Sequence, residues 1–483
     1  MKENRINKFF VSNWEFMLTS LGLTALILFS QDHIFFWDTV QLGSKHATFY
    51  FDNELALKFL PNEIDSGHIP AFGYVLAVLW KIFGKTLLVS HLYILPFAIG
   101  IAWQLNSLIK RFFKKKNIIW AMLIVVLDTT FLSQVSLVSP DIPLLFFFLF
   151  GLNSILKKKK MAIAIAFSFL FLISLRGMIL TVPLFLFDLY LNGNIDLKNL
   201  KNSFISIFKT GVPYIPAAII FIGFSWFHFE QKGWIGYHEN SPWAVFFQKV
   251  GFQGMIKNAA IFGWRLLDFG RVFVWLVAFS VLVYMRKGRI KFSNQSKKLG
   301  VLFGLILIFL SIPAIIYFDL KGHRYFMPIY FSFSLFVSYL VLELIEMTIV
   351  KKTLVSFILI GLLSGSFWVY PRDVAQGWDS TLAHLPYYKL RKEMIDFIEK
   401  QGIKKESVGY DFPGAYPQKF LDLSKETWCF PEADLNKQEY ILYSNVVNDF
   451  TNPELDELFT DWTVLSEKKS VTVELILFKN PRF

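Results

Sequence analysis

Residues 139–152 read SPDIPLLFFFLFGL, one aspartate followed directly by an apolar run without a further charge. Such a run is apolar on every side of a helix, which is typical of a helix enclosed by a membrane or by other helices. Asp141 would then lie at a membrane boundary, where an unpaired charge is costly and is usually kept for a function. The partners of Asp141 therefore bear on what this protein does.

The composition of the whole chain agrees with this stretch. The chain has 483 residues, of which 54% are hydrophobic and 18% charged, and it contains 55 Phe. Soluble domains have about 45–50% apolar and about 25% charged residues. Many apolar runs approach the length of about 20 residues that crosses a hydrocarbon core of about 30 Å. The sequence therefore predicts a polytopic membrane protein.

Hydropathy predicts about eleven transmembrane helices. The predicted spans are 14–36, 86–109, 118–138, 142–156, 161–176, 178–191, 205–229, 272–285, 299–318, 326–349 and 353–370. The segment 70–83 is short and amphipathic, so we expect it at the membrane interface. The basic N-terminus runs into the first span without a small-residue cleavage site, so this span is expected to be retained.

The basic clusters predict the orientation in the membrane. The formal net charge is +12, and much of the positive charge lies at 2–8, 110–116, 157–160, 286–298 and 351–352. With these spans, all five segments fall on the side of the N-terminus, which the positive-inside rule makes cytoplasmic. An odd number of spans puts the C-terminus outside. This distribution points to membrane lipids rather than nucleic acid as the partner of the positive charge.

The composition changes at residue 372. The tail, 372–483, is polar, with an amphipathic helix predicted at 387–401 and strands predicted at 407–412, 439–447, 462–467 and 471–478. Its single cysteine, Cys429, cannot form an intramolecular disulfide. We therefore expect an all-α polytopic membrane domain, 1–371, with a small α/β C-terminal domain, 372–483, on the outer face.

Four motifs follow one another on the side expected to face outward. Asp38 comes just after the first span, a G-H-x-P element lies at 67–70, an S-x-D-x-P-L-x-F-F turn begins at Ser139, and H-R-Y-x-x-P occupies 323–328. In this order they resemble the C-type glycosyltransferase superfamily, close to bacterial relatives of protein O-mannosyltransferase and lipid A aminoarabinose transferase. The resemblance covers roughly residues 1–371.

The resemblance implies an enzyme that moves a sugar from a polyprenyl-phosphate carrier to an acceptor lipid, glycan or protein on the outer face, with inversion at the anomeric carbon. Asp38 matches the first-loop acid of the family, its candidate general base, and Asp141 matches the second-loop acid. His68 stands where some relatives carry a phosphate-contacting lysine. Arg324 and Tyr325, after His323, match a late Arg-Tyr pair expected near the carrier.

One departure from the family concerns the residue after Asp38. Many relatives have Asp-Glu at this place, whereas here Thr39 follows. A carboxylate pair could hold Mg²⁺ or Mn²⁺, but no dense ligand cluster in the sequence requires a metal. The departure puts metal dependence in doubt and leaves Asp38 more isolated.

The residue types suit the chemistry. A carboxylate can remove the proton of an acceptor hydroxyl or amine as the new bond forms. Guanidinium and imidazolium groups stabilise the charge of a departing phosphate, and Arg can do so with two parallel hydrogen bonds. In the segment 231–245, Trp234 and His238, with Tyr237 and Trp243, are candidates to stack on sugar.

Each of these residues also has a structural interpretation. Asp141 could cap the following helix, and Asp38 could be an ordinary interfacial acid. His68 could be a solvated loop residue, and Arg324 a headgroup anchor. The aromatic residues of 231–245 could form part of an interfacial belt. Asp128, inside the third span, is expected to be structural, whereas Arg176, at the end of the fifth, is left open.

Two other functions compete with an enzyme. A transporter or flippase of lipid-linked sugar would usually show repeated halves and charges near the midplane. The sequence has no internal repeat and no phosphate-binding Gly-rich loop, which argues against ATP-driven transport. A catalytically silent scaffold of the cell envelope is the other alternative. The Lys-, Ile-, Phe- and Asn-rich composition suggests an AT-rich bacterial genome, so we expect a multi-pass protein of the bacterial inner membrane whose active site faces the periplasm.

Overall fold

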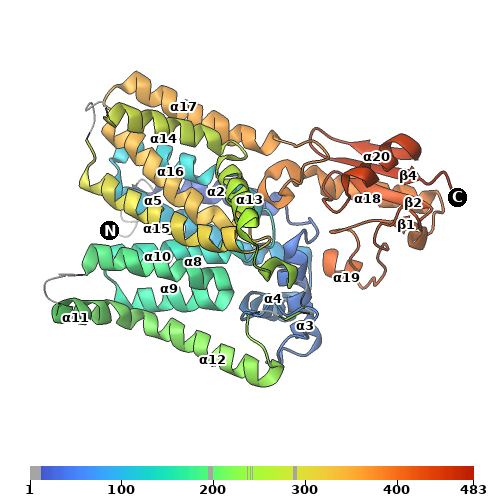
Figure 1. Ribbon diagram of the computed structural model, residues 1–483, viewed down its shortest axis with the longest axis horizontal. Helices are drawn as coiled ribbons and strands as arrows, with labels where there is room; N and C mark the ends of the chain where they lie inside the picture. The colour runs from blue at the N-terminus through green and yellow to red at the C-terminus, as the bar shows by residue number, and fades with distance from the viewer. Residues whose placement is uncertain (1–11, 194–199, 237, 240, 242, 287–290) are drawn as a thin grey trace, which may run out of the picture.

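The computed structural model describes residues 12–193, 200–236, 238, 239, 241, 243–286 and 291–483. A long bundle of roughly parallel helices carries a smaller mixed domain at one end, where the chain terminates (Figure 1). The described helices of the bundle are α2 (Trp14–Phe29), α5 (Leu87–Phe112), α6 (Ile118–Val126), α7 (Thr129–Val135), α8 (Asp141–Leu156), α9 (Lys160–Ile173), α10 (Leu175–Asn192), α11 (Leu200–Gly211), α12 (Ile215–Lys232), α13 (Phe252–Leu267), α14 (Arg271–Arg286), α15 (Asn294–Ile316), α16 (Met327–Tyr339) and α17 (Thr348–Ser364).

The protein is a multi-pass membrane protein. Among the described residues, six helices are long and apolar enough to cross a membrane, or eight if each of two bent pairs counts as one span. The predicted number of about eleven is not confirmed, because predicted spans such as those of α8 and α9 are helices of 16 and 14 residues. Hydropathy alone does not separate a short helix enclosed by the bundle from a helix that spans the membrane.

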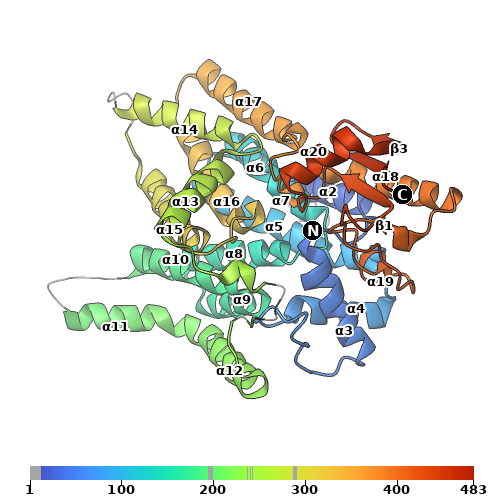
Figure 2. The ribbon, with the colours of Figure 1, turned by 45° about the vertical axis from the view of Figure 1, so that its right-hand side comes forward.

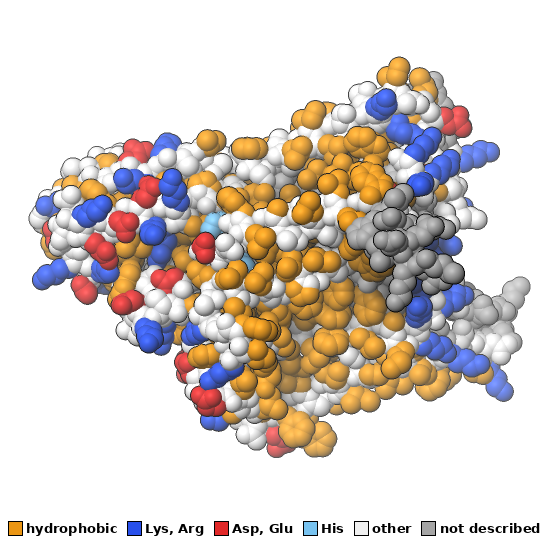
Figure 3. Space-filling view, turned by 180° about the vertical axis from the view of Figure 1, so that it is seen from behind, with side chains coloured by type: hydrophobic (Ala, Val, Ile, Leu, Met, Phe, Trp, Pro, Cys, Tyr) orange, Lys and Arg blue, Asp and Glu red, His pale blue; other side chains and the backbone are white. Residues whose placement is uncertain are grey.

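The surface of the bundle agrees with a membrane location. Apolar side chains cover its middle, while Lys and Arg gather at the end away from the small domain (Figure 3). α11 and α12 run along one edge of the bundle (Figure 2), and only 11% of their apolar window is buried inside the protein. These helices therefore present most of their surface to lipid. Which end of the bundle faces the cytoplasm stays a prediction.

The segment 230–271 was expected to be an outer loop, but the structure forms α13 within it. α13 packs beside α15 and buries Asn258 and Phe262, while Lys257, Asn258 and Arg265 interrupt its hydropathy. The segment 70–83 forms α4 (Ala71–Phe83), next to the short α3 (His46–Asp52), at the end of the bundle that carries the small domain (Figure 1).

Two sharp bends face each other inside the bundle. α6 and α7 meet at 73°, where the Asp128 carboxylate accepts hydrogen bonds from two backbone N–H groups of the first turn of α7. α13 and α14 meet at 89°, where Gly270 has a φ of +83° and a Cβ would lie 2.0 Å from the Gly361 carbonyl oxygen. Arg271 Nε lies 2.7 Å from Asp128 Oδ2 and joins the two bends. Asp128 thus has the structural role expected for it.

The C-terminal domain contains α18 (Pro386–Lys400), α19 (Gln418–Leu421), α20 (Asn452–Asp461) and a four-stranded sheet of order β1-β2-β4-β3. Its strands are β1 (Val408–Gly409), β2 (Tyr440–Ser444), β3 (Thr463–Lys469) and β4 (Glu474–Lys479). β1 pairs with β2 in parallel and the other pairs are antiparallel. The predicted helix and strands all occur, whereas α19 and α20 were not predicted.

The two parts of the chain share a hydrophobic core. Phe36 and Leu137, both from the membrane part, are fully buried in the cluster that contains Trp378 and Tyr387. The Phe35 backbone N–H donates a hydrogen bond of 2.8 Å to the Leu421 carbonyl. The C-terminal domain is therefore packed against the end of the bundle, beside the loop that follows α2.

Candidate active site

A cavity of about 620 Å³ lies where the bundle meets the C-terminal domain. The loop after α2, the start of α10, the short helix η5 (His323–Phe326) and two segments of the C-terminal domain contribute to its wall. Five of the predicted site residues line this cavity, namely Asp38, His68, His323, Arg324 and Tyr325. Segments that are far apart in the chain therefore contribute to one chamber.

Arg324 is the centre of the charged groups in this cavity. Its Nη2 pairs with Asp38 Oδ2 and its Nη1 with Asp379 Oδ2, while its Nε lies 3.4 Å from Asp141 Oδ2. Nη2 also donates a hydrogen bond of 2.9 Å to the Tyr325 hydroxyl. The Asp38 side chain is 32% exposed and that of Asp141 only 2%, so Asp38 is the more accessible of the two predicted acids.

Local backbone structure presents Asp38 to the cavity. The Phe36 N–H donates to Thr39 Oγ1 at 2.9 Å, and the Thr39 hydroxyl donates to the Phe36 carbonyl at 2.7 Å. Trp37, between them, has a φ of +51°, which is unusual for a bulky residue. Thr39, at the place where many relatives of the family carry an acid, thus holds the turn in which Asp38 lies.

Asp141 lies in the first turn of α8, but its carboxylate does not cap the helix. The carboxylate pairs instead with Arg176 and Arg324, and the Arg176 guanidinium lies 4.2 Å from the centre of the Tyr325 ring. Its negative charge near the N-terminus of α8 still interacts favourably with the helix dipole. Arg176, whose role the sequence left open, is therefore part of the site.

The environment affects the proton affinity of two predicted residues. Burial raises the pKa of Asp38 above its usual value, and the neighbouring Arg324 opposes this effect. Burial lowers the pKa of His68 to about 4, so this imidazole is neutral at pH 7. His68 can therefore donate or accept a hydrogen bond at neutral pH, but it carries no charge.

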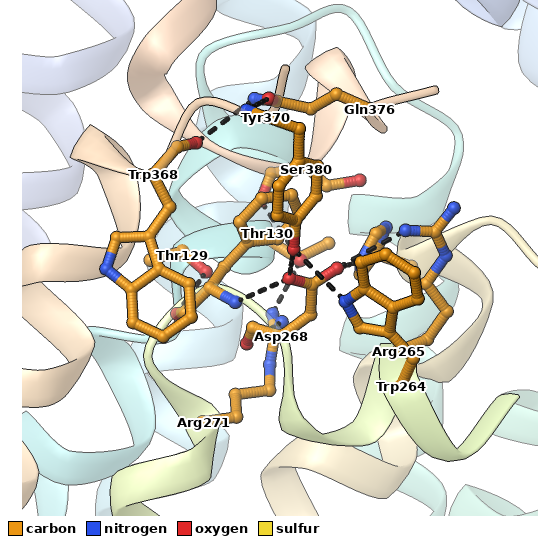
Figure 4. A network of polar contacts seen from close by, with 12 residues as sticks. Thr129, Thr130, Trp264, Arg265, Asp268, Arg271, Trp368, Tyr370, Gln376 and Ser380 are labelled. Atoms are coloured by element: carbon orange, nitrogen blue, oxygen red, sulfur yellow. Dashed lines mark hydrogen bonds and ion pairs between the residues drawn. The ribbon is translucent and has the colours of Figure 1, made fainter. Parts of the chain in front are cut away.

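His323 faces a buried acid that the sequence analysis did not single out. His323 Nε2 lies 2.7 Å from Asp268 Oδ2, at the bend between α13 and α14. Figure 4 shows the Asp268 carboxylate also facing the Tyr370 hydroxyl, which donates to it, and Arg265, whose Nη1 lies 3.3 Å away. This network holds the imidazole ring of His323, the residue before Arg324, in one orientation.

Trp234 and His238 lie in a different cluster. The Trp234 ring packs edge-on against His228 with centroids 4.3 Å apart, and His238 lies 5.6 Å from Trp234. Neither is among the described residues that line the cavity, whereas Trp243 is. Tyr237 lies outside the described residues. Trp234 and His238 thus do not line the cavity with Asp38 and Arg324.

Three further polar residues of the cavity were not predicted from the sequence. Asp379, Arg265 and Lys321 all line it. Arg265 was hidden in a segment expected to be a loop. Asp379 follows Trp378 just as Asp38 follows Trp37, but this short repetition has no meaning until the structure brings the two pairs to one cavity.

The described residues contain no group of three or more His, Cys, Asp or Glu side chains arranged to hold a metal ion. Asp38, Asp141 and Asp379 are each directed at Arg324 instead. In this arrangement they do not fit the site for Mg²⁺ or Mn²⁺ that was considered for a carboxylate pair, and we derive no chemical step through a metal.

The fold is similar to that of a lipid A aminoarabinose transferase, one of the relatives to which the order of the motifs pointed. It is similar to two crystal structures of ArnT, the lipid A aminoarabinose transferase, from Cupriavidus metallidurans: one bound to undecaprenyl phosphate, with a TM-score of 0.51, and one in the apo state, with a TM-score of 0.54. Each alignment has 11% sequence identity and covers 95% of this chain and 97% of that chain. No protein-family model and no curated protein sequence matches the chain.

Proposed function

We propose that this protein is an integral-membrane glycosyltransferase that moves a sugar from a polyprenyl-phosphate carrier to an acceptor lipid, glycan or protein. The observation that carries the proposal is the meeting of Asp38 and Asp141 at Arg324, where Asp38 and Arg324 line a cavity at the end of an apolar bundle. A lipid-linked sugar has its lipid in the bilayer and its sugar in water, and a cavity at the end of the apolar bundle can hold both parts. The similarity of the fold to ArnT, which was crystallised with undecaprenyl phosphate bound, supports this class of carrier.

In the proposed reaction Asp38 is the general base. Its carboxylate takes the proton of an acceptor hydroxyl or amine while the acceptor atom bonds to the anomeric carbon of the sugar. The bond between that carbon and the phosphate oxygen breaks, and its electron pair leaves with the lipid phosphate. A single displacement of this kind inverts the anomeric centre. Asp141 holds Arg176 and Arg324 beside the base.

The departing phosphate requires positive charge and hydrogen-bond donors. Arg324 is engaged by several carboxylates. Two other cationic side chains on the cavity wall, Arg265 and Lys321, are each paired with a single aspartate and share the phosphate contact that was predicted for Arg324. His68, neutral at pH 7, contributes a hydrogen bond. The basic end of the bundle lies in the cytoplasm under the positive-inside rule, so the cavity opens to the periplasm of a bacterial inner membrane.

The test is turnover by purified protein in detergent, where no second compartment exists. The protein would be incubated with each of a panel of polyprenyl-phosphate sugars, in water with candidate acceptors. Mass spectrometry would then detect the free polyprenyl phosphate that is released. We expect the native protein to consume one donor and Asp38→Asn to be slower by about 10²–10⁴-fold, the usual contribution of a general base. A transporter or scaffold would leave every donor intact, and that result would end the proposal.

Asp32→Asn is the matched control. Asp32 lies in the same loop after α2, six positions before Asp38, and its side chain is exposed. We expect turnover by this variant to equal that of the native protein. If Asp38→Asn also retains native turnover while it folds normally, Asp38 is not the base.

A further inference from the structure

The C-terminal domain reaches into the catalytic cavity with the segment 375–380. This segment passes directly over η5, where a Cβ at Gly377 would lie 2.8 Å from His323 Nδ1. Only a glycine permits so close an approach without a shift of one of the two chain segments. Two residues later, the Asp379 carboxylate meets Arg324.

Both oxygens of the Asp379 carboxylate have partners. Oδ2 pairs with Arg324 Nη1, and Oδ1 accepts a hydrogen bond of 3.1 Å from the Ser380 hydroxyl. The Asp379 side chain is 13% exposed, close to the 11% of Arg324. A carboxylate that is held on both sides and largely removed from water has a defined orientation, unlike an exposed surface acid.

The main chain at Asp379 is held by α7. The Asp379 carbonyl accepts hydrogen bonds from Ser133 Oγ at 2.8 Å and from Gln134 Nε2 at 2.7 Å. The Ser380 carbonyl accepts a third bond, of 3.1 Å, from Thr130 Oγ1. The C-terminal domain is therefore fastened to the membrane part at the position where it supplies this acid.

The same helix supports the second acid of the site. The Ser139 hydroxyl donates to Gln134 Oε1, and the Asp141 N–H donates to Ser139 Oγ at 3.2 Å. Gln134 thus connects the Asp379 main chain to the turn that precedes α8. Through Gln134, Asp379 and Asp141 are both held beside Arg324, although 238 positions separate the two acids in the sequence.

We infer that Asp379 is a positioning residue that the C-terminal domain contributes to the catalytic site, and that it acts on Asp38 through Arg324. The inference rests on the proposed function, in which Asp38 is the base. Asp379 shares the positive charge of Arg324 and orients its Nη1, so that Nη2 remains directed at Asp38. The C-terminal domain is then a part of the reaction centre as well as a covering domain.

The charge on Asp379 has a consequence for the base. The charged groups that face Asp38 are Arg324, Arg176, Asp379 and Asp141. The negative charge of Asp379 raises the pKa of Asp38, and Asp379 also competes for the charge of Arg324. Without that charge Asp38 would bind its proton less tightly, and it would be a weaker base.

The test compares pH profiles of kcat/KM for the donor that the native protein turns over. In Asp379→Asn, which keeps the shape of the side chain, we expect the acidic limb to move to lower pH, by on the order of one unit, and the plateau rate to fall several-fold. Asp379→Glu keeps the charge, so its acidic limb should stay close to that of the native protein. Asp373→Asn changes an exposed acid just before the segment, so it is the matched control and should leave the profile unchanged.

A merely structural role would lower the rate equally at every pH. If Asp379→Asn shows that uniform loss, with the acidic limb unmoved, the inference is wrong while the proposed function stands. The protonation of Asp38 can also be measured without turnover. Infrared spectra recorded over a range of pH, with and without the Asp38→Asn change, give the signal of the Asp38 carboxyl by difference. A lower midpoint in the Asp379→Asn background supports the inference even if no donor is consumed, and an unchanged midpoint overturns it.

Discussion

At the scale of the residue, the ion pair of Asp128 and Arg271 shows how the bundle accommodates buried charge. The two side chains are 3% and 4% exposed, and the Arg271 guanidinium also lies 3.7 Å from the centre of the Tyr330 ring. Removal of one partner leaves the other charge buried and unpaired. We expect Arg271→Met to lower the free energy of unfolding by about 3–5 kcal/mol.

Thermal unfolding in detergent measures this loss. The double variant Arg271→Met with Asp128→Asn should lose less than Arg271→Met alone, because it leaves no unpaired charge and Asn can still cap α7. Lys389→Met, which removes an exposed partner of Glu393, is the control and should change stability by about 0.5 kcal/mol or less. Equal losses in the single and double variants would contradict the explanation.

At the scale of the element, the bend between α13 and α14 supports the site from a distance. It places Asp268 beside His323, which precedes Arg324. Gly270→Ala would put a Cβ at a φ of +83°, and within 2.0 Å of the Gly361 carbonyl. We expect this variant to unfold at a lower temperature and to lose glycosyl transfer, because the bend must open to admit the methyl group.

Gly263→Ala is the control for this prediction. Gly263 lies inside α13, and no atom would come within 4 Å of its added Cβ. Alanine favours a helix over glycine by about 0.5–1 kcal/mol, so this variant should be as stable as the native protein or more so. If both glycine variants behave alike in melting and turnover, the bend is not under the steric constraint described.

At the scale of the whole molecule, the contact between the C-terminal domain and the loop after α2 contains two histidines, His33, which is half-buried, and His384, which is buried. The His33 ring stacks on Tyr388 with centroids 4.0 Å apart, and His384 stacks on Phe36 at 5.1 Å. Burial lowers the pKa of His33 to about 3 and that of His384 to about 4. Nearby charged or titratable groups are His91, beside His33, and Asp379, beside His384.

Both histidines titrate near 6.5 when they are exposed, so their stabilising contribution is complete above that pH. It is lost progressively as the pH falls from 6.5 toward 4, by about 2 kcal/mol for His384 at pH 5. We therefore expect the melting temperature to fall between pH 7 and pH 5. His33→Phe, which keeps a stacking ring, should show a smaller fall, and an identical fall in both proteins would refute the prediction.

Local patterns in the sequence determined the membrane class, the positions of most helices and the helix and strands of the C-terminal domain. Hydropathy and periodicity are properties of contiguous residues, so α5, α15, α18 and the strands could be predicted without knowledge of their neighbours. The family resemblance selected Asp38, Asp141 and Arg324 by their order along the chain.

Only the tertiary structure decided which charges meet. Asp379 and Arg324 come from different domains, and Arg176 pairs with Asp141 across the gap between two helices, so no local pattern contains these contacts. α13 was not predicted because Lys257, Asn258 and Arg265 interrupt its apolar run, and hydropathy does not include its packing against α15. A buried charge is strongly destabilising without an oppositely charged partner, and these partners are far apart in the sequence, so only the folded chain places them together.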